Sequence, residues 1–230
     1  MAIICRAHRL LFILTPRTGS SAVAKALCEQ LHGENIPEEN ILDGDGRFLV
    51  SKKHGTLEQL QKYGVIRPEE RQQLFVFTCV RNPFDSLVSF YIKKAVTYQP
   101  FLDKPDSFVY RIPGYAEDMR WAREHTFNEW IARKYAPTLL DRLLGRRRSG
   151  PSSLFSRYTD GTDAIMRFEH LQEDLEKVLQ QAGVKQHVTV PNFNVTPDRE
   201  RDYRPYYNAR TRAIVEARFA EDLRRYGYQF

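Results

Sequence analysis

The first strong hydrophobic run of the chain covers residues 11–14 and reads Leu-Phe-Ile-Leu. It ends before Thr15 and is followed by small and polar residues, a pattern typical of a parallel strand that is buried on both faces. From Ser21 to Leu31 apolar residues recur at helical spacing, and Gly33 then supplies a stop. This segment therefore predicts a strand, a loop and a helix, in that order.

A second unit of the same kind begins at residues 75–80, Phe-Val-Phe-Thr-Cys-Val, which form the clearest predicted strand. Asn82 can cap a following helix, and Pro83 suits its first position. An apolar stripe then continues to about residue 96, which predicts an amphipathic helix.

Shorter patterns predict further elements. Residues 48–50 and 164–168 read as strands, and a helix that follows the second of them should end at Gly183. Alanines and a leucine at helical spacing over residues 213–223 predict one last helix. The periodicity weakens between residues 98 and 162, where we expect an irregular excursion over the sheet with one helix.

Strands that alternate with helices predict an α/β fold. We expect a three-layer, P-loop-like fold in which helices flank a mainly parallel central sheet. Because 230 residues can bury one substantial core, residues 1–230 are expected to form a single domain. In such a fold the ligand site lies at the carboxyl ends of the strands.

The loop at residues 16–21, Pro-Arg-Thr-Gly-Ser-Ser, joins the first strand to its helix. Its backbone N–H groups and the helix dipole can face an anion, Gly19 permits a close approach, and Arg17 adds a fixed cation. Further hydroxyl donors are expected from Thr18, Ser20 and Ser21. The loop lacks the GxxxxGK[ST] pattern of ATP-binding P-loops. Taken alone, it could also be an ordinary polar connection in which a serine caps the helix.

A second anion-binding pattern follows strand 75–80. Arg81 lies at the end of this strand, and Ser89 lies on the helix face that Asn82 also occupies, so both side chains can reach one phosphate. The alternative is that Arg81 pairs with Asp85 and that Ser89 only packs. Two such patterns at adjacent strand ends favour binding.

Together these segments resemble the sulfotransferases that use 3′-phosphoadenosine 5′-phosphosulfate (PAPS), and within them family 2, which includes carbohydrate sulfotransferases and many bacterial members. Residues 16–21 are similar to the family's 5′-phosphosulfate loop. Residues 80–91, VRNPFDSLVSFY, are similar to its 3′-phosphate strand and helix, with Arg81 and Ser89 at the binding positions.

The resemblance extends over most of the chain. Residues 167–171, Arg-Phe-Glu-His-Leu, are similar to the family's R-[FY]-E-x-L segment, and residues 203–207 and 227–230 resemble the family-2 carboxyl terminus. Arg204, inside the Tyr-Arg-Pro-Tyr-Tyr segment, is a further candidate for PAPS binding. The other basic clusters, Arg146 to Arg148 and Arg199 with Arg201, read as solvated surface.

The resemblance implies that the sulfuryl group moves from PAPS to a hydroxyl of an acceptor, a glycan or a small molecule, with release of adenosine 3′,5′-bisphosphate (PAP). Many members carry Lys where this chain has Arg17. Because arginine does not readily lend a proton, Arg17 would act by stabilising charge on the bridging oxygen, and Lys53 or Lys52 would share that task. Residues 98–162 would shape the acceptor pocket.

His54, in the segment Ser-Lys-Lys-His-Gly-Thr, resembles the family's catalytic histidine base. A neutral imidazole suits removal of the hydroxyl proton near pH 7, and the neighbouring lysines would depress its pKa. A carboxylate is the competing base in some members with Arg in the loop, and the candidates here are Glu34, Glu38 and Glu39.

The composition of the chain indicates what kind of partner it binds and in which compartment it acts. A formal charge of +6 and a pI near 9.2 favour an anionic partner. The three cysteines form no CxxC pair, which favours the reducing cytoplasm, and the scattered histidines argue against a zinc site. The apolar runs are too short for a membrane span. We expect the protein to bind no metal and no nucleic acid, and to be a monomer or dimer.

Two other functions remain as alternatives to sulfuryl transfer. The protein could be a nucleotide or small-molecule kinase, or a basic polyanion-binding module.

Overall fold

The computed structural model describes residues 2–138, 141, 143, 152–191 and 202–230. The chain forms two compact units: the first comprises Met1–Arg81 and Phe155–Pro197, and the second comprises Asn82–Leu154 and Asp198–Phe230. Of the helices in the described ranges, none is long and apolar enough to cross a membrane.

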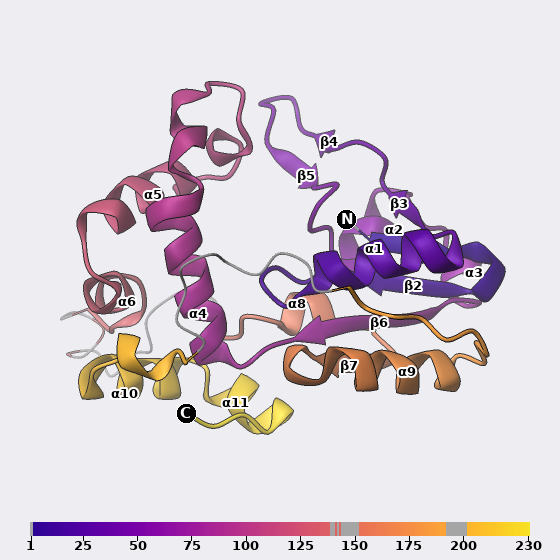
Figure 1. The fold of residues 1–230 in the computed structure, drawn as a ribbon. Helices are drawn as coiled ribbons and strands as arrows, with labels where there is room; N and C mark the ends of the chain where they lie inside the picture. Colours follow the sequence, from indigo (N-terminus) through magenta and orange to yellow (C-terminus); the bar gives the residue numbers. More distant parts are fainter. Residues whose placement is uncertain (1, 139–140, 142, 144–151, 192–201) are drawn as a thin grey trace. The chain divides into compact units, whose positions relative to one another are not determined.

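The first unit contains a five-stranded sheet in the order β3-β1-β2-β6-β7 (Figure 1). Its strands are β1 (Ala2–Cys5), β2 (Leu10–Ile13), β3 (Glu34–Ile36), β6 (Phe75–Val80) and β7 (Ala164–Arg167). β6 is parallel to both β2 and β7, whereas β1 is antiparallel to both β2 and β3. Four of the five strands therefore share one direction, which confirms the mainly parallel α/β sheet.

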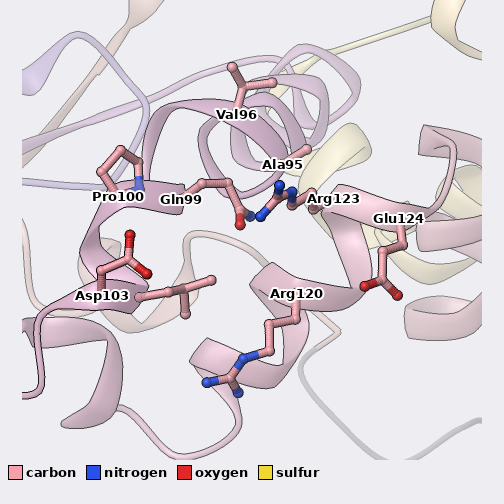
Figure 2. A pocket seen from close by; sticks show the side chains of 9 residues that line it. Ala95, Val96, Gln99, Pro100, Asp103, Arg120, Arg123 and Glu124 are labelled. Carbon is pink, nitrogen blue, oxygen red and sulfur yellow. The ribbon is translucent and has the colours of Figure 1, made fainter.

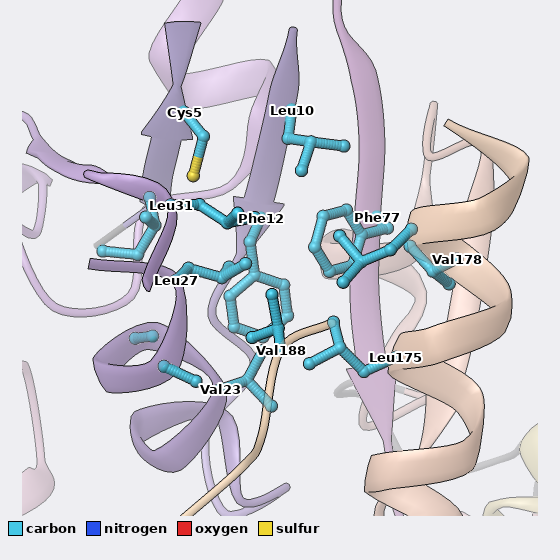
Figure 3. Packing of buried hydrophobic residues seen from close by; sticks show 14 of the residues in the cluster. Cys5, Leu10, Phe12, Val23, Leu27, Leu31, Phe77, Leu175, Val178 and Val188 are labelled. Atoms are coloured by element: carbon cyan, nitrogen blue, oxygen red, sulfur yellow. The ribbon is translucent and has the colours of Figure 1, made fainter. Parts of the chain in front are cut away.

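One face of this sheet is covered by α1 (Ser20–Leu31) and α9 (Leu171–Gln181). Alternate strand residues point to this face, among them Leu10, Phe12 and Phe77 (Figure 3). The rings of Phe12 and Phe77 stack with their centroids 5.0 Å apart. Both helices present leucine and valine side chains to these rings, so the hydrophobic periodicity that predicted them is the periodicity of their buried faces.

The opposite face is covered by α2 (Leu57–Lys62) and α8 (Ser156–Thr159). The intervening strand residues, Leu11, Ile13 and Val76, pack there. Helices on both faces of one sheet make the three layers that the sequence predicted. The short helix α3 (Pro68–Arg71) adds no buried side chain.

The strand at residues 48–50 forms, but it lies outside this central sheet. β5 (Phe48–Val50) pairs with β4 (Ile41–Leu42) in a separate two-stranded sheet. The lysines and the histidine that follow β5 are therefore not carried by the end of a central strand.

The second unit is helical. Asn82 caps α4 (Pro83–Ile92) by accepting a hydrogen bond from the Phe84 N–H, as the sequence predicted. A π-helix over Lys93–Thr97 continues α4 to one residue beyond the end of the predicted helix, near residue 96. The other elements are η3 (Gln99–Asp103), η4 (Phe108–Tyr110), α5 (Tyr115–Glu124), α6 (Phe127–Tyr135), η6 (Arg204–Tyr206), α10 (Ala209–Arg218) and α11 (Ala220–Tyr226).

Two expectations need correction here. The single last helix is two helices, because the chain leaves helical geometry at Phe219 between α10 and α11. Phe219 is fully buried among the aromatic side chains of this unit, so tertiary packing sets the break. The described part of residues 98–162 also contains α5 and α8 besides the expected helix α6, so the segment is less irregular than its pattern indicated.

A buried polar cluster joins the helices of the second unit. Lys94 is only 5% exposed and pairs with Asp118, which also accepts from Lys134 at 2.6 Å and from the Trp130 indole at 2.8 Å. The pKa of Lys94 is lowered to about 8, chiefly by burial and also by the charge of Lys134, while Asp118 opposes the shift. Asp118 thus holds three helical segments together.

Candidate active site

The loop at residues 16–21 follows β2 at the carboxyl edge of the sheet and leads into α1. Its backbone turns twice into the left-handed region, at Arg17 with φ of 66° and at Gly19 with φ of 71°. Such a conformation is unusual for arginine and is typical of residues that the surrounding structure holds in place. The first N–H groups of α1 have no partners within the helix, so the loop presents donors where an anion can bind.

Two of the three predicted hydroxyl donors make hydrogen bonds within this segment. The Thr18 and Ser20 hydroxyls both donate to the Thr15 carbonyl oxygen, at 2.9 and 2.7 Å. Each hydroxyl has only one hydrogen, so neither can also donate to a phosphate oxygen in this arrangement. In this arrangement they fix the curvature of the loop, and the groups that can face an anion include the loop's backbone N–H groups, the Arg17 guanidinium and the hydroxyl of the half-buried Ser21.

Buried threonines join the ends of β2 and β6 beneath the loop. The Thr78 hydroxyl donates to the Ile13 carbonyl oxygen at 2.8 Å. Because its hydrogen is used there, the 2.8 Å contact between the Thr15 and Thr78 hydroxyls requires Thr15 to be the donor. Thr15, the residue immediately before the loop, is thereby tied to the neighbouring strand.

Arg81 also lies against this loop and is 8% exposed. Its guanidinium donates to the Arg17 carbonyl oxygen at 3.1 Å and lies 4.0 Å from the centroid of the Phe168 ring. The Cys79 thiol makes a 3.2 Å contact with the Thr18 carbonyl oxygen. The structure therefore brings together Arg17 and Arg81, which come from the two anion-binding patterns of the sequence.

His54 lies next to Leu14, two residues before the loop. Its Nδ1 is 3.1 Å from the Leu14 carbonyl oxygen, which fixes the Nδ1–H tautomer and leaves Nε2 as a proton acceptor. Burial lowers the pKa of His54 to about 3; the Leu14 hydrogen bond opposes this, and the charges of Lys53 and Arg17 add to it. Lys52 and Lys53 themselves are exposed.

Of the alternative carboxylate bases, Glu34 is the one that lies away from the carboxyl edge of the sheet. Glu34 pairs in register with Ile4, which faces Leu11 in the middle of β2, and its carboxylate lies 3.7 Å from Arg6. This position is further from the loop than the carboxyl end of β2. Glu38 and Glu39 follow β3, which ends at the same level of the sheet as β2, so they lie towards the same carboxyl edge as the loop, and both are exposed.

Ser89 and Arg204 belong to the second unit. Ser89 is 1% exposed and lies two turns along α4 from Asn82, on the same face. Arg204 is exposed and donates to the Asp202 carboxylate at 3.1 Å. Arg146 to Arg148, Arg199 and Arg201 lie outside the described residues.

The matched carboxyl-terminal segments pack against the start of α4. The Asn82 amide donates to the Gln229 carbonyl oxygen at 2.8 Å and to the Tyr203 hydroxyl at 3.1 Å. The Phe84 ring meets the Phe230 ring edge to face at 4.9 Å. Sequence reasoning assigned Asn82 only to capping and missed this second role. The sequence did contain a signal for this role, because the segment around Asn82 and the carboxyl-terminal segments all resemble one family.

The model of the Sulfotransferase family matches residues 1–229. The crystal structure of the mouse sulfotransferase SULT7A1 complexed with PAP has 12% sequence identity and a TM-score of 0.44, and the similarity covers 95% of this chain and 86% of the mouse chain. No curated protein sequence matches the chain. Because the family model spans almost the whole sequence, the chain belongs to the sulfotransferase family.

Proposed function

We propose that this enzyme binds the 5′-phosphosulfate of PAPS with the loop at residues 16–21 and the 3′-phosphate with Arg81 and Ser89. The observation that carries the proposal is the strand-to-helix loop with two left-handed residues, which has the cation Arg17 within it and Arg81 against it. Backbone donors, a helix amino terminus and fork-shaped guanidinium groups suit a ligand with several anionic oxygens. Arg204 is a further donor-binding candidate.

The proposed reaction is in-line attack of an acceptor hydroxyl on sulfur, with His54 as general base. The hydroxyl proton passes to His54 Nε2 as the new S–O bond forms. The bond from sulfur to the bridging oxygen breaks, and its electron pair leaves with the phosphate of PAP. Arg17 and Lys53 stabilise this charge. A His54 that is neutral in the free enzyme is ready to accept a proton, and the anionic donor favours the imidazolium form that results.

The acceptor pocket is proposed within residues 98–162 and the preceding π-helix. A cavity of about 690 Å³ is lined there by charged residues of η3 and α5 and by apolar residues of the π-helix (Figure 2). This volume suits a small molecule or a short glycan. Its arginines, Arg120 and Arg123, can bind an anionic substituent, whereas Asp103 and Glu124 can accept hydrogen bonds from acceptor hydroxyls.

The experiment supplies PAPS with acceptors of three kinds, namely neutral sugars, uronic-acid glycans and small alcohols, and measures the release of PAP. Arg120→Ala and Arg123→Ala should raise the acceptor KM and leave PAP affinity unchanged. Arg210→Ala, an exposed arginine of α10 that does not line the cavity, is the matched control. An unchanged acceptor KM in both pocket variants would contradict the acceptor pocket.

We further propose that the enzyme acts in the cytoplasm as a monomer or dimer. Cys5, Cys28 and Cys79 are free thiols, and burial raises the pKa of Cys5 to about 12. Thiols of this kind are compatible with a reducing compartment.

A further inference from the structure

The alignment of two neighbouring strands places Phe168 beside Arg81. β6 and β7 are parallel, and Val80 of β6 is the partner of Arg167 in β7. Arg81 and Phe168 are the residues that immediately follow these two strands, so the chain leaves the sheet at the same level at both positions. The Arg81 guanidinium carbon lies 4.0 Å from the centroid of the Phe168 ring, which is cation–π geometry.

The same ring also supports the donor loop directly. A Cβ atom added to Gly19 would lie 2.9 and 3.0 Å from two carbon atoms of the Phe168 ring and 2.7 Å from Leu171 Cδ1. The Gly19 backbone is therefore in close contact with the ring edge. Arg81 in turn donates to the Arg17 carbonyl oxygen at 3.1 Å. Phe168 thus touches the loop at Gly19 and acts on Arg17 through Arg81.

We infer that Phe168 is a positioning residue that holds the left-handed backbone of the donor loop and the Arg81 guanidinium in the geometry that binds PAPS. The inference rests on the proposed role of this loop in donor binding. A rigid aromatic ring suits the task, because it offers Arg81 a flat face and offers Gly19 an edge that leaves no room for a side chain. A loop that is ordered before binding loses less entropy when the donor binds.

If Phe168 only stabilised the hydrophobic core, its replacement would lower stability without a specific effect on PAP binding. Phe75 provides a control that distinguishes this role from the positioning role. Phe75 and Phe168 both pack, partly buried, against the same hydrophobic core. Phe75 is the first residue of β6 and pairs with Leu10, the first residue of β2. It therefore lies at the amino-terminal end of the strand, away from the loop. Phe75→Leu therefore removes a ring from the same core without touching the loop, and it is the matched control for Phe168→Leu.

The test is calorimetric titration of the full chain with PAP, with thermal unfolding of each variant measured in parallel. Phe168→Leu should weaken PAP binding about tenfold, the order expected when a cation–π contact and its packing are lost. Phe168→Tyr, which keeps the ring, should restore binding to within about twofold, whereas Phe75→Leu should lower thermal stability and leave PAP affinity unchanged. If Phe168→Leu does not fold, Phe168→Met, which preserves side-chain volume without an aromatic face, replaces it under the same criteria.

Two outcomes would overturn the inference: PAP affinity of Phe168→Leu equal to that of the wild type, or an equal loss of affinity in Phe75→Leu. Failure of the unaltered chain to bind PAP would instead overturn the proposed donor site, and the inference with it. These failures are distinguishable because the first two require that the wild-type protein binds PAP, whereas the last is a failure of the wild-type protein itself.

Discussion

The Nδ1 atom of His54 lies 3.1 Å from the carbonyl oxygen of Leu14, a residue 40 positions earlier in the chain. This contact connects the segment after β5 to the end of β2, two residues before the donor loop. It orients the imidazole and leaves Nε2 as the basic nitrogen, which is the arrangement that a general base requires.

The first prediction concerns His54 and catalysis. His54→Ala should lower kcat by roughly 10²- to 10⁴-fold, the usual contribution of a general base, because no other group would remove the hydroxyl proton. PAP affinity should change less than about threefold, since the imidazole does not hold the donor. Steady-state kinetics and calorimetry measure the two effects, and His187→Ala, an exposed histidine, is the control. A kcat close to that of the wild type would remove His54 from the mechanism.

The second prediction concerns stability against pH. The pKa of His54 is about 3 in the folded protein and near 6.5 in an unfolded chain, so the unfolded chain binds the extra proton between these values. The free energy of unfolding should therefore fall as pH falls through this window, by about 1–3 kcal/mol between pH 7 and pH 4 from this group. Urea unfolding at both pH values should show a smaller fall in His54→Gln. Equal falls in both proteins would contradict the buried, neutral imidazole.

The third prediction separates close packing at Gly19 from backbone strain. Gly19 has a φ of 71° and Gly64 a φ of 70°, but an added Cβ atom would meet nothing within 4 Å at Gly64. Gly64→Ala should lower the free energy of unfolding by about 1–2 kcal/mol, the cost of a left-handed alanine. Gly19→Ala adds the clash with Leu171 and Phe168, so it should be less stable and should bind PAP at least about tenfold more weakly. Matching effects in both variants would show that the loop tolerates a side chain.

The fourth prediction concerns the buried ions of the second unit. Asp118→Ala leaves Lys94 and Lys134 without their shared carboxylate, and the free energy of unfolding should fall by about 3–5 kcal/mol. Glu117→Ala, one residue earlier, removes an exposed ion pair with Arg133 and should cost less than about 1 kcal/mol. Denaturant titrations of both variants test this, and a small effect of Asp118→Ala would show that the cluster is solvated.

Much of the first unit could be predicted from the sequence, because its strands are continuous apolar runs and its helices have strict periodicity. β2, β6, α1 and α9 follow from patterns that tertiary contacts reinforce. β1 was missed because its four residues precede Arg6 and His8 without a turn signal, and only its pairing with β2 and β3 defines it. The break at Phe219 was missed because no glycine or proline marks it.

The candidate site was predicted by its residues but not by their hydrogen bonds. The motif located Thr18 and Ser20, yet which acceptor their hydroxyls find depends on the left-handed turn at Arg17, and an arginine gives no local signal for such a turn. The roles of Leu14 and Phe168 depend on contacts between distant segments and on strand register. These are set by the fold as a whole.

The measurement that tests the central claim most directly is calorimetric titration of the chain with PAP and, separately, with 5′-AMP. If the loop at residues 16–21 and Arg81 form the donor site, PAP should bind with micromolar or tighter affinity, 5′-AMP should bind at least about tenfold more weakly, and Arg81→Ala should remove most of the difference. Absence of PAP binding, or equal affinity for PAP and 5′-AMP, would contradict the account.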